Sequence, residues 1–406
     1  MTRTDGAQAP GARTPWGLVV MLGALTGMAP LALDMYLPSL PSIGVDLAAS
    51  PAATQATMAA FLGAMALGQL FYGPASDRIG RRPALITGVA VYIAGSAACA
   101  LAPSAPALIA ARFLQGLGAC AGGVVARAMI RDRFDHIDTA RMLSLMMLII
   151  GLAPILAPLL GGAIVEVGSW RAIFWVMVAF GAALGALVLW RLQETRSPEV
   201  AAHARGEHPL RAYLSLFGHP RLLGYALAGA LNGALLFTYI SSSADLLIGA
   251  YGIPPGAFGW VFGVNAFGII GANQVNRRLL GRWTPDEVMA RASLVCVGFA
   301  TALVVAAATG FGGMWSVLVL LFLLLSSFGF LQGNTMAGAL DVDPRRAGTI
   351  SAIMGALSFG TGAAAAWCAG ALHDGTARPM AAVMLAACAG SALALHLLAF
   401  RGSAKA

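Results

Sequence analysis

Hydrophobic residues in this sequence are grouped into long blocks, each close to the 20 or so residues that a helix needs to cross a bilayer. Short segments rich in arginine, glycine or proline separate the blocks. The pattern predicts twelve transmembrane helices, at residues 16–37, 52–74, 83–103, 106–127, 140–165 and 170–191 in the first half and at 221–247, 255–278, 286–308, 313–336, 347–371 and 378–400 in the second. We therefore expect an all-α integral membrane protein.

The longest polar segment divides these helices into two groups of six. It comprises residues 192–220 and is typical of a linker between an N-terminal bundle at 16–191 and a C-terminal bundle at 221–400, with tails at 1–15 and 401–406. A weak internal repeat agrees with this division, since the sequence Asp77 to Arg81 after the second helix loosely matches Asn276 to Arg282 after the eighth. Duplicated six-helix halves with a binding site between them are a known transporter architecture.

Basic residues indicate the orientation in the membrane. All but three of the 25 fall on one side of the predicted topology, and the exceptions are Arg112 within a helix and Arg171 and Arg378 on the other side. Because cytoplasmic loops are enriched in Lys and Arg, both termini and the linker are expected to be cytoplasmic. This placement at helix ends also argues against nucleic acid as a partner, despite the net charge of +8.

Composition narrows the functional class. The chain is 59% hydrophobic and 10% charged, against about 25% charged residues in a soluble domain. Lys405 is the single lysine, so the sequence lacks the P-loop whose lysine holds nucleotide phosphates, and transport would depend on an ion gradient. The five cysteines lie in apolar blocks without metal spacing, and no activated serine is apparent. We expect no metal, no cofactor and no enzymatic activity.

The most specific motif is GPASDRIGRRP, from Gly73 to Pro83. A carboxylate at the end of a helix can face the positive N-terminus of a neighbouring helix, and a glycine permits a tight turn. The motif resembles the loop signature of the major facilitator superfamily, with Ala75 where the family usually has leucine. That resemblance implies a conformational latch with a partner on the eleventh helix, made by Gly73, Asp77, Arg78, Gly80, Arg81 and Arg82. The alternative is an ordinary arginine-rich loop.

Two charged residues inside the spans are candidates for proton coupling. Arg112 lies about seven residues, or ~10 Å, into the fourth helix, which is awkward for snorkelling, and the family places such an arginine in its proton-relay region. Asp34 lies in LALDMYLPSLP, shortly before Pro38 and Pro41, where the first helix is expected to stop. We predict that the two charges pair at a similar depth, which would offset their desolvation, and that Asp34 binds the coupled proton. A purely structural acid is the alternative.

The fifth helix contains GLAPILAPLLGG, in which small or kinking residues recur at spacings of three and four. These are Gly151, Pro154, Pro158, Gly161 and Gly162. The segment resembles the motif that marks antiporters in this superfamily, although Ala157 replaces the usual glycine. We expect it to pack against the glycines of the eighth helix, and general small-residue packing is the alternative reading.

DMYLPSLP, together with the segment from Phe237 to Arg278, resembles the Bcr/CflA subfamily of drug/proton antiporters, and the resemblance extends over about residues 16 to 400. It implies proton-coupled export of small drug-like molecules, such as chloramphenicol- and bicyclomycin-type antibiotics, from the bacterial cytoplasm. A proton symporter that imports a metabolite is the alternative. We also expect a lipid-embedded monomer in the inner membrane. Polar and aromatic residues within spans can line a substrate cavity, or can form hydrogen bonds between helices. They are Tyr36, Gln115, Asn232, Tyr239, Asn265, Gln332 and Asn334.

Overall fold

The computed structural model describes residues 16–134, 136–198 and 218–400, which are helical except for short connections and contain no strand. The predicted tails at 1–15 and 401–406, and most of the predicted linker, lie outside these residues.

Each predicted span corresponds to one long helix. The first half contains α1 (Trp16–Asp34), α3 (Pro51–Ile79), α4 (Arg81–Ala100), α5 (Ala105–Arg133), α6 (His136–Val167) and α7 (Trp170–Arg191). The second half contains α10 (Pro220–Ala244), α11 (Pro255–Leu279), α12 (Pro285–Thr309), α13 (Gly313–Val342), α14 (Ala347–Ala371) and α15 (Arg378–Ala394). Eleven described helical segments are long and apolar enough to cross a membrane, and α6 adds an apolar stretch at Gly151–Val167.

Local sequence signals explain several helix ends. The hydroxyl groups of Ser50 and Ser104 accept hydrogen bonds from backbone N–H groups in the first turns of α3 and α5. Thr284 and Glu287 form a reciprocal capping box at the start of α12. α12 ends at Gly310, whose φ of 72° lies in the left-handed region that favours glycine.

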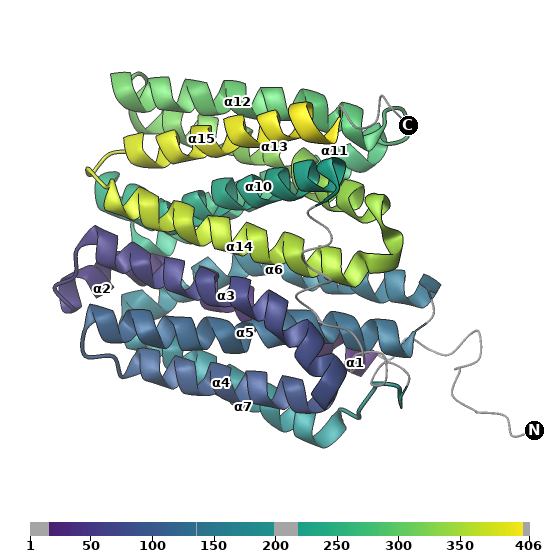
Figure 1. Cartoon of the computed structure of the whole chain (residues 1–406). Coiled ribbons are helices and arrows are strands. Elements are labelled where there is room, and N and C mark those ends of the chain that lie inside the picture. Colours follow the sequence, from purple (N-terminus) through teal and green to yellow (C-terminus); the bar gives the residue numbers. More distant parts are fainter. Residues whose placement is uncertain (1–15, 135, 199–217, 401–406) are drawn as a thin grey trace, which may run out of the picture.

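The helices form two bundles of six, which Figure 1 shows one above the other, with α1 to α7 in the lower bundle. The bundles meet along two pairs of helices, where α3 packs against α14 and α6 packs against α11. α6 and α11 correspond to the fifth and eighth predicted helices. Their glycines had indicated this pairing. Movement of one bundle relative to the other would have to occur at these two contacts.

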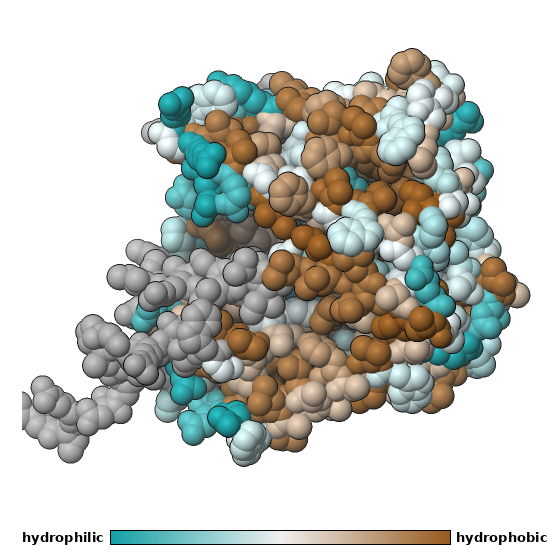
Figure 2. Space-filling model, turned by 180° about the vertical axis from the view of Figure 1, so that it is seen from behind, coloured by the Kyte–Doolittle hydropathy of each residue, from teal (hydrophilic) through white to brown (hydrophobic). Residues whose placement is uncertain are grey.

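The outer surface is that of a membrane protein. Figure 2 shows hydrophobic side chains over the middle of one face and hydrophilic side chains gathered toward its two ends. Large apolar residues such as Phe71, Trp260, Phe267 and Trp315 are mostly exposed. In water such a surface would be unfavourable, whereas in a bilayer it contacts lipid tails.

Glycines allow α5 to lie very close to its neighbours. A Cβ atom added at Gly118 would collide with the backbone of Tyr92 and would lie 2.6 Å from the carbonyl oxygen of Gly88. A Cβ atom added at Gly122 would collide with the carbonyl oxygen of Leu25. The backbones of α1, α4 and α5 are therefore in direct contact, as small residues permit in membrane proteins.

We expect Gly118→Ala to lower the free energy of unfolding by about 1–3 kcal/mol, because the added methyl group must push α4 away from α5. Gly123→Ala is the matched control on the same helix, since its Cβ atom would be 3.8 Å from the methyl carbon of Thr26, an ordinary contact. Thermal unfolding of both variants in detergent would test this, and equal losses of stability would contradict the packing argument.

The first helix does not stop where its prolines predicted. α1 ends at Asp34, but after a short turn the chain remains helical through η1 (Leu37–Ser39) and α2 (Leu40–Asp46). Pro38 and Pro41 each lie in the first turn of one of these segments, where a missing N–H group costs little. Asp34 therefore lies about 12 residues, or ~18 Å, from the end of this helical stretch, deeper than a helix that stops at Pro38 would place it.

Candidate functional site

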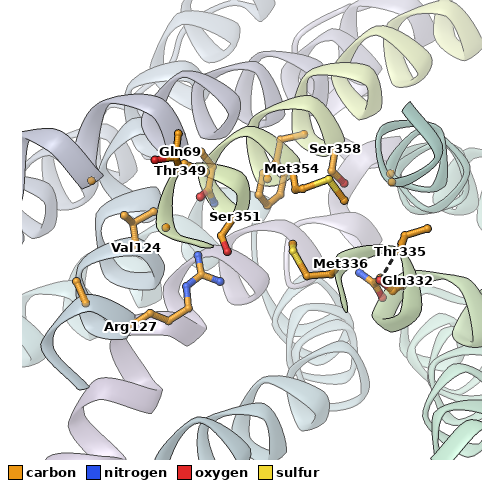
Figure 3. Close-up of a pocket in the computed structure, with 18 of the residues that line it drawn as sticks. Gln69, Val124, Arg127, Gln332, Thr335, Met336, Thr349, Ser351, Met354 and Ser358 are labelled. Atoms are coloured by element: carbon orange, nitrogen blue, oxygen red, sulfur yellow. Dashed lines mark hydrogen bonds between the residues drawn. The ribbon is translucent and has the colours of Figure 1, made fainter. Parts of the chain in front are cut away.

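A cavity of about 640 Å³ lies between the two bundles. It is at the arginine-rich end of the helices, since Asp77 and Arg131 from the first half and Met336 and Gly348 from the second half contribute to its wall. Figure 3 shows labelled side chains of both halves around the cavity, among them Gln69, Arg127, Ser351 and Gln332. A volume of this size can accommodate a drug-sized molecule.

The cavity wall is divided in chemical character. The large apolar side chains include those of Phe237, Phe328, Phe359, Met336 and Met354. Polar groups include Gln69, Asn232, Gln332, Thr349 and Ser358. An apolar wall with a few polar groups is typical of small-molecule sites, in which contact area gives affinity and the polar groups fix orientation.

At the opposite end the bundles are in close contact. The side-chain Nε2 of Gln55 on α3 donates a hydrogen bond of 2.8 Å to Oδ2 of Asp245, at the end of α10. The backbone N–H of Gly256 donates to Oε1 of Glu166 on α6 over 3.0 Å. This side is held together by contacts between the halves, while the arginine-rich side contains the cavity.

Arg112 is fully buried, with 0% of its surface exposed. Its NH1 donates to the carbonyl oxygen of Ala32 at 3.0 Å and to Oε1 of Gln115 at 2.6 Å. The guanidinium also lies 4.4 Å from the ring centres of Tyr36 and Phe61. Two aromatic faces and two oxygen acceptors thus compensate a charge that would otherwise be costly to bury.

Asp34 is also buried, with 4% of its surface exposed, but the ion pairs of the described residues do not include one between Asp34 and Arg112. The predicted pair is therefore absent in this conformation. Residues two apart on a helix point about 200° apart, so the position of Tyr36 against Arg112 directs Asp34 away from it.

The predicted latch residues surround the loop between α3 and α4. Arg81 is buried, and it contacts Oδ1 of Asp77 at 2.5 Å and Oδ2 of Asp132 on α5 at 2.8 Å. Gly80 has a φ of 111°, and a Cβ atom there would lie 2.6 Å from Oε2 of Glu194. A side chain at position 80 would be strained and would displace Glu194, so the turn requires glycine.

The remaining latch residues lie beside this loop. Gly73, Asp77 and Arg78 line the cavity, and Arg82 donates from NH2 to the carbonyl oxygen of Leu189 at 2.9 Å. The hydrogen bonds and ion pairs given for Asp77, Arg81 and Arg82 all join groups within the first half. The implied partner on the eleventh helix, which is α14, stays a prediction for a conformation in which the halves close here.

Glu194, which follows α7, caps the start of α4. Its carboxylate accepts hydrogen bonds from the backbone N–H groups of Arg81 and Arg82 at 2.9 and 3.1 Å, and from those of Thr195 and Arg196 at 3.0 Å each. Partial burial alone would raise the pKa of Glu194, but these four donors together lower it below its usual value of 4.5. Glu194 therefore ties the latch loop to the segment after α7.

We expect Glu194→Gln to reduce stability by about 1 kcal/mol at neutral pH, a modest value because the carboxylate is exposed. The pKa of Glu194 is lower in the folded state than in the unfolded state. Its contribution to stability is therefore complete above about pH 5 and is lost as the pH falls through the folded-state pKa. Thermal unfolding from pH 7 downward should therefore bring the wild type and the variant together as the pH falls below the folded-state pKa of Glu194. A difference that does not change with pH would contradict the role of the charge.

The predicted antiporter motif lies on α6, which continues through Pro154 and Pro158. A Cβ atom at Gly161 would collide with the carbonyl oxygen of Met35, and one at Gly162 would lie 2.6 Å from that of Pro255. Gly151 has more room, with its closest neighbour at 4.0 Å. The two adjacent glycines therefore allow α6 to touch both α1 and the start of α11, at the end where the bundles are closed.

The predicted cavity residues separate into two groups. Asn232 and Gln332 lie in the cavity wall. The others form hydrogen bonds inside the protein, since Tyr36 bonds with Thr57, Gln115 with Arg112 and Ser96, Tyr239 with Asn265, and Asn334 with Asn276. The sequence left open whether these residues line a cavity or form hydrogen bonds between helices. Hydrogen bonding describes the second group in the present conformation.

Sequence reasoning missed several residues of this site. Arg127 was counted only as a basic residue near a helix end, and Gln69 and Ser358 gave no signal. Asp245 and Gln55, which join the halves at the closed end, were also missed. The carboxyl group of Asp245, after a run of three serines at the end of an apolar block, was the one available signal.

Comparison with known proteins agrees with this architecture. The family model of the Major Facilitator Superfamily matches residues 22–367. The bicyclomycin resistance protein homolog of Haemophilus influenzae is 32% identical over 383 residues, which cover 94% of this chain and 96% of that protein. The multidrug resistance protein MdtL of Escherichia coli is 32% identical over 335 residues, covering 82% of this chain and 83% of that protein.

Among solved structures, the xylose transporter XylE from E. coli, in a partially occluded inward open conformation, superposes with a TM-score of 0.70. The alignment covers 94% of this chain and 97% of that chain at 14% identity, so it shows the fold alone. The family match, by contrast, covers most of the chain and includes both bundles. The chain belongs to the major facilitator superfamily, whose members are multi-pass membrane transporters rather than enzymes.

Proposed function

We propose that this protein exports small drug-like molecules from the bacterial cytoplasm across the inner membrane in exchange for protons. The observation that carries the proposal is the cavity of about 640 Å³ between the bundles, whose wall combines large apolar side chains with amide, hydroxyl and arginine groups. Such a wall suits apolar, weakly polar molecules of varied shape, because methionine and phenylalanine side chains adapt to different ligands. The relatives named for bicyclomycin and multidrug resistance support the same substrate class.

The distribution of arginines supports export as the direction of transport. Cytoplasmic ends of membrane helices are enriched in basic residues, so the arginine-rich end, where the cavity lies, is assigned to the cytoplasm together with both termini and the 192–220 linker. In this assignment the cavity would load substrate from the cytoplasm. Rocking of residues 16–191 against residues 221–400 would then expose it to the other side.

Asp34 is the residue that we propose to carry the coupled proton. A buried carboxyl group without an ionic partner is more stable with a proton than as a free charge. In the outward-open state Asp34 would take up a proton from the outside. After return to the inward-open state, an approach of Asp34 to Arg112 would stabilise the carboxylate and release the proton to the cytoplasm. Ala32, two residues before Asp34, already accepts a hydrogen bond from Arg112, so Arg112 lies beside this part of α1 and a rotation of the helix would bring Asp34 toward it.

Transport into everted membrane vesicles would test the direction. With an acidic lumen, an antiporter accumulates chloramphenicol inside the vesicles, and a protonophore abolishes the accumulation. A symporter under the same gradient moves its substrate out of the lumen with the protons, which would overturn the proposal in favour of import. Vesicles without the protein give the background, and an everted vesicle presents the cytoplasmic face to the medium.

A further inference from the structure

Arg127 has no partner in the cavity wall. It lies on α5, about six residues before the end of the helix at Arg133, and its side chain is exposed to the cavity. It forms no hydrogen bond or ion pair with any residue in the described ranges, whereas Arg81 in the same wall is held by Asp77 and Asp132. A cation without a partner, deep between two bundles, requires an explanation.

The second half of the protein does not offer a partner for Arg127. Among the described residues, its contribution to the wall consists of apolar side chains, glycines, hydroxyl groups and amides, such as Phe237, Gln332, Thr349 and Ser351, and it includes no carboxylate. The one acidic residue of the wall, Asp77, is engaged with Arg81. Closing these two surfaces over the cavity would not neutralise Arg127.

We propose that Arg127 is an anion-binding subsite, which holds the carboxylate or sulfonate group of an amphipathic substrate. Figure 3 shows its guanidinium directed toward Ser351 and Gln69, whose hydroxyl and amide groups can donate further hydrogen bonds to an anion. A guanidinium binds planar oxyanions with two parallel hydrogen bonds, and these bonds are strongest away from bulk water. The charged group of the substrate therefore binds near Arg127.

The remainder of the cavity accommodates the apolar part of the same molecule. Phe237, Phe359, Met336 and Met354 line the cavity together with Arg127, so one amphipathic anion can contact both kinds of group. The four arginines and one aspartate of the wall also make it unfavourable for a cation, and this selects against cationic drugs. This inference rests on the proposed transport function, since it specifies the charge of the substrate within the same cavity.

Binding of a matched pair of probes to the full-length protein would test the subsite. Naphthalene-2-sulfonate carries the negative charge, and naphthalene-2-sulfonamide has nearly the same shape without it. In nanodiscs of neutral lipid, titration calorimetry should show Arg127→Gln weakening sulfonate binding about 10- to 100-fold, as expected for a charge-assisted hydrogen bond. Sulfonamide binding should change less than about twofold, because the apolar wall is intact.

Two variants make the comparison decisive. Arg133→Gln removes an exposed arginine of the same helix outside the cavity wall, and it should bind both probes like the wild type. Arg127→Lys retains the charge without the two-pronged geometry, and it should recover part of the sulfonate affinity. Unchanged sulfonate binding in Arg127→Gln, or an equal loss for both probes, would overturn the subsite.

Anionic lipid is the other source of the same chemistry. If phosphatidylglycerol added to the nanodiscs displaces the sulfonate from the wild type, the occupant is a lipid headgroup, and the assignment to a substrate is overturned. Vesicle transport separates this inference from the proposed function. Proton-driven chloramphenicol uptake together with Arg127-independent sulfonate binding would overturn the subsite alone, whereas Arg127-dependent binding without proton-driven uptake would support the subsite and overturn export.

Discussion

Asp34→Asn is expected to abolish proton-driven accumulation of substrate while leaving the protein folded. The carboxyl group is buried and forms no ion pair with a described residue, so a neutral amide of nearly the same shape fits its place. Asparagine cannot bind and release a proton, and without that step no free energy passes from the proton gradient to the substrate. The accumulation ratio in everted vesicles should therefore fall to about one, the value at equilibrium without coupling.

The control for this variant is Asp46→Asn. Asp46 belongs to the helical continuation of the same segment but is exposed, and its Oδ2 accepts hydrogen bonds from Arg171 and Trp170 at the closed end. The Asp46→Asn variant should retain most of the substrate accumulation. If Asp34→Asn still concentrated substrate against its gradient, proton coupling would have to be assigned to another acid, and Asp245, which joins the halves through Gln55, would be the next candidate.

Arg112→Ala should destabilise the first bundle by about 3–5 kcal/mol, the range for truncating a large buried side chain. The change removes the guanidinium that lies against Tyr36 and Phe61, and it leaves the carbonyl oxygen of Ala32 without that donor. Labelling of the buried Cys99 and Cys120 by a thiol-reactive dye during heating would measure the loss, since these thiols become accessible on unfolding.

Arg112→Met separates stability from function. Replacing a buried charge with an apolar side chain of similar volume is often neutral for stability, so this variant should fold but should not couple protons to transport. Arg171→Ala, which removes a half-exposed ion pair with Asp46, should cost less than about 1 kcal/mol. A normal melting temperature for Arg112→Ala would show that the buried contacts contribute little.

The helices could be predicted from the sequence because membrane spans are governed by length and apolarity alone. Each predicted block contains a helix, and the arginine-rich turn at Arg78 to Arg82 connects α3 and α4 as expected. The error at Pro38 and Pro41 has a physical cause. An interior proline removes a backbone hydrogen bond and can end or kink a helix, whereas a proline in a first turn costs little. The sequence alone does not state which of the two applies at Pro38 and Pro41.

The partners of individual side chains could not be predicted, because they depend on helix rotation. Asp34 and Arg112 are both buried, as expected for charged residues inside predicted spans, yet their pairing depended on an angle about the axis of α1 that sequence does not specify. The same uncertainty affected Asn265 and Asn334, which bond to Tyr239 and Asn276 rather than lining the cavity. Arg127 was missed because a cavity has no sequence signature, since residues from distant helices form it.

The backbone contacts at Gly118 and Gly122 have a consequence for how this transporter can change over generations. A point mutation at either position adds atoms where there is no space, so it is selected against whatever molecule is transported. Gln332 and Ser351 are under no such constraint, because they are exposed in the cavity wall. New resistance phenotypes should therefore arise from codons for the cavity wall, with the helices that carry it left unaltered.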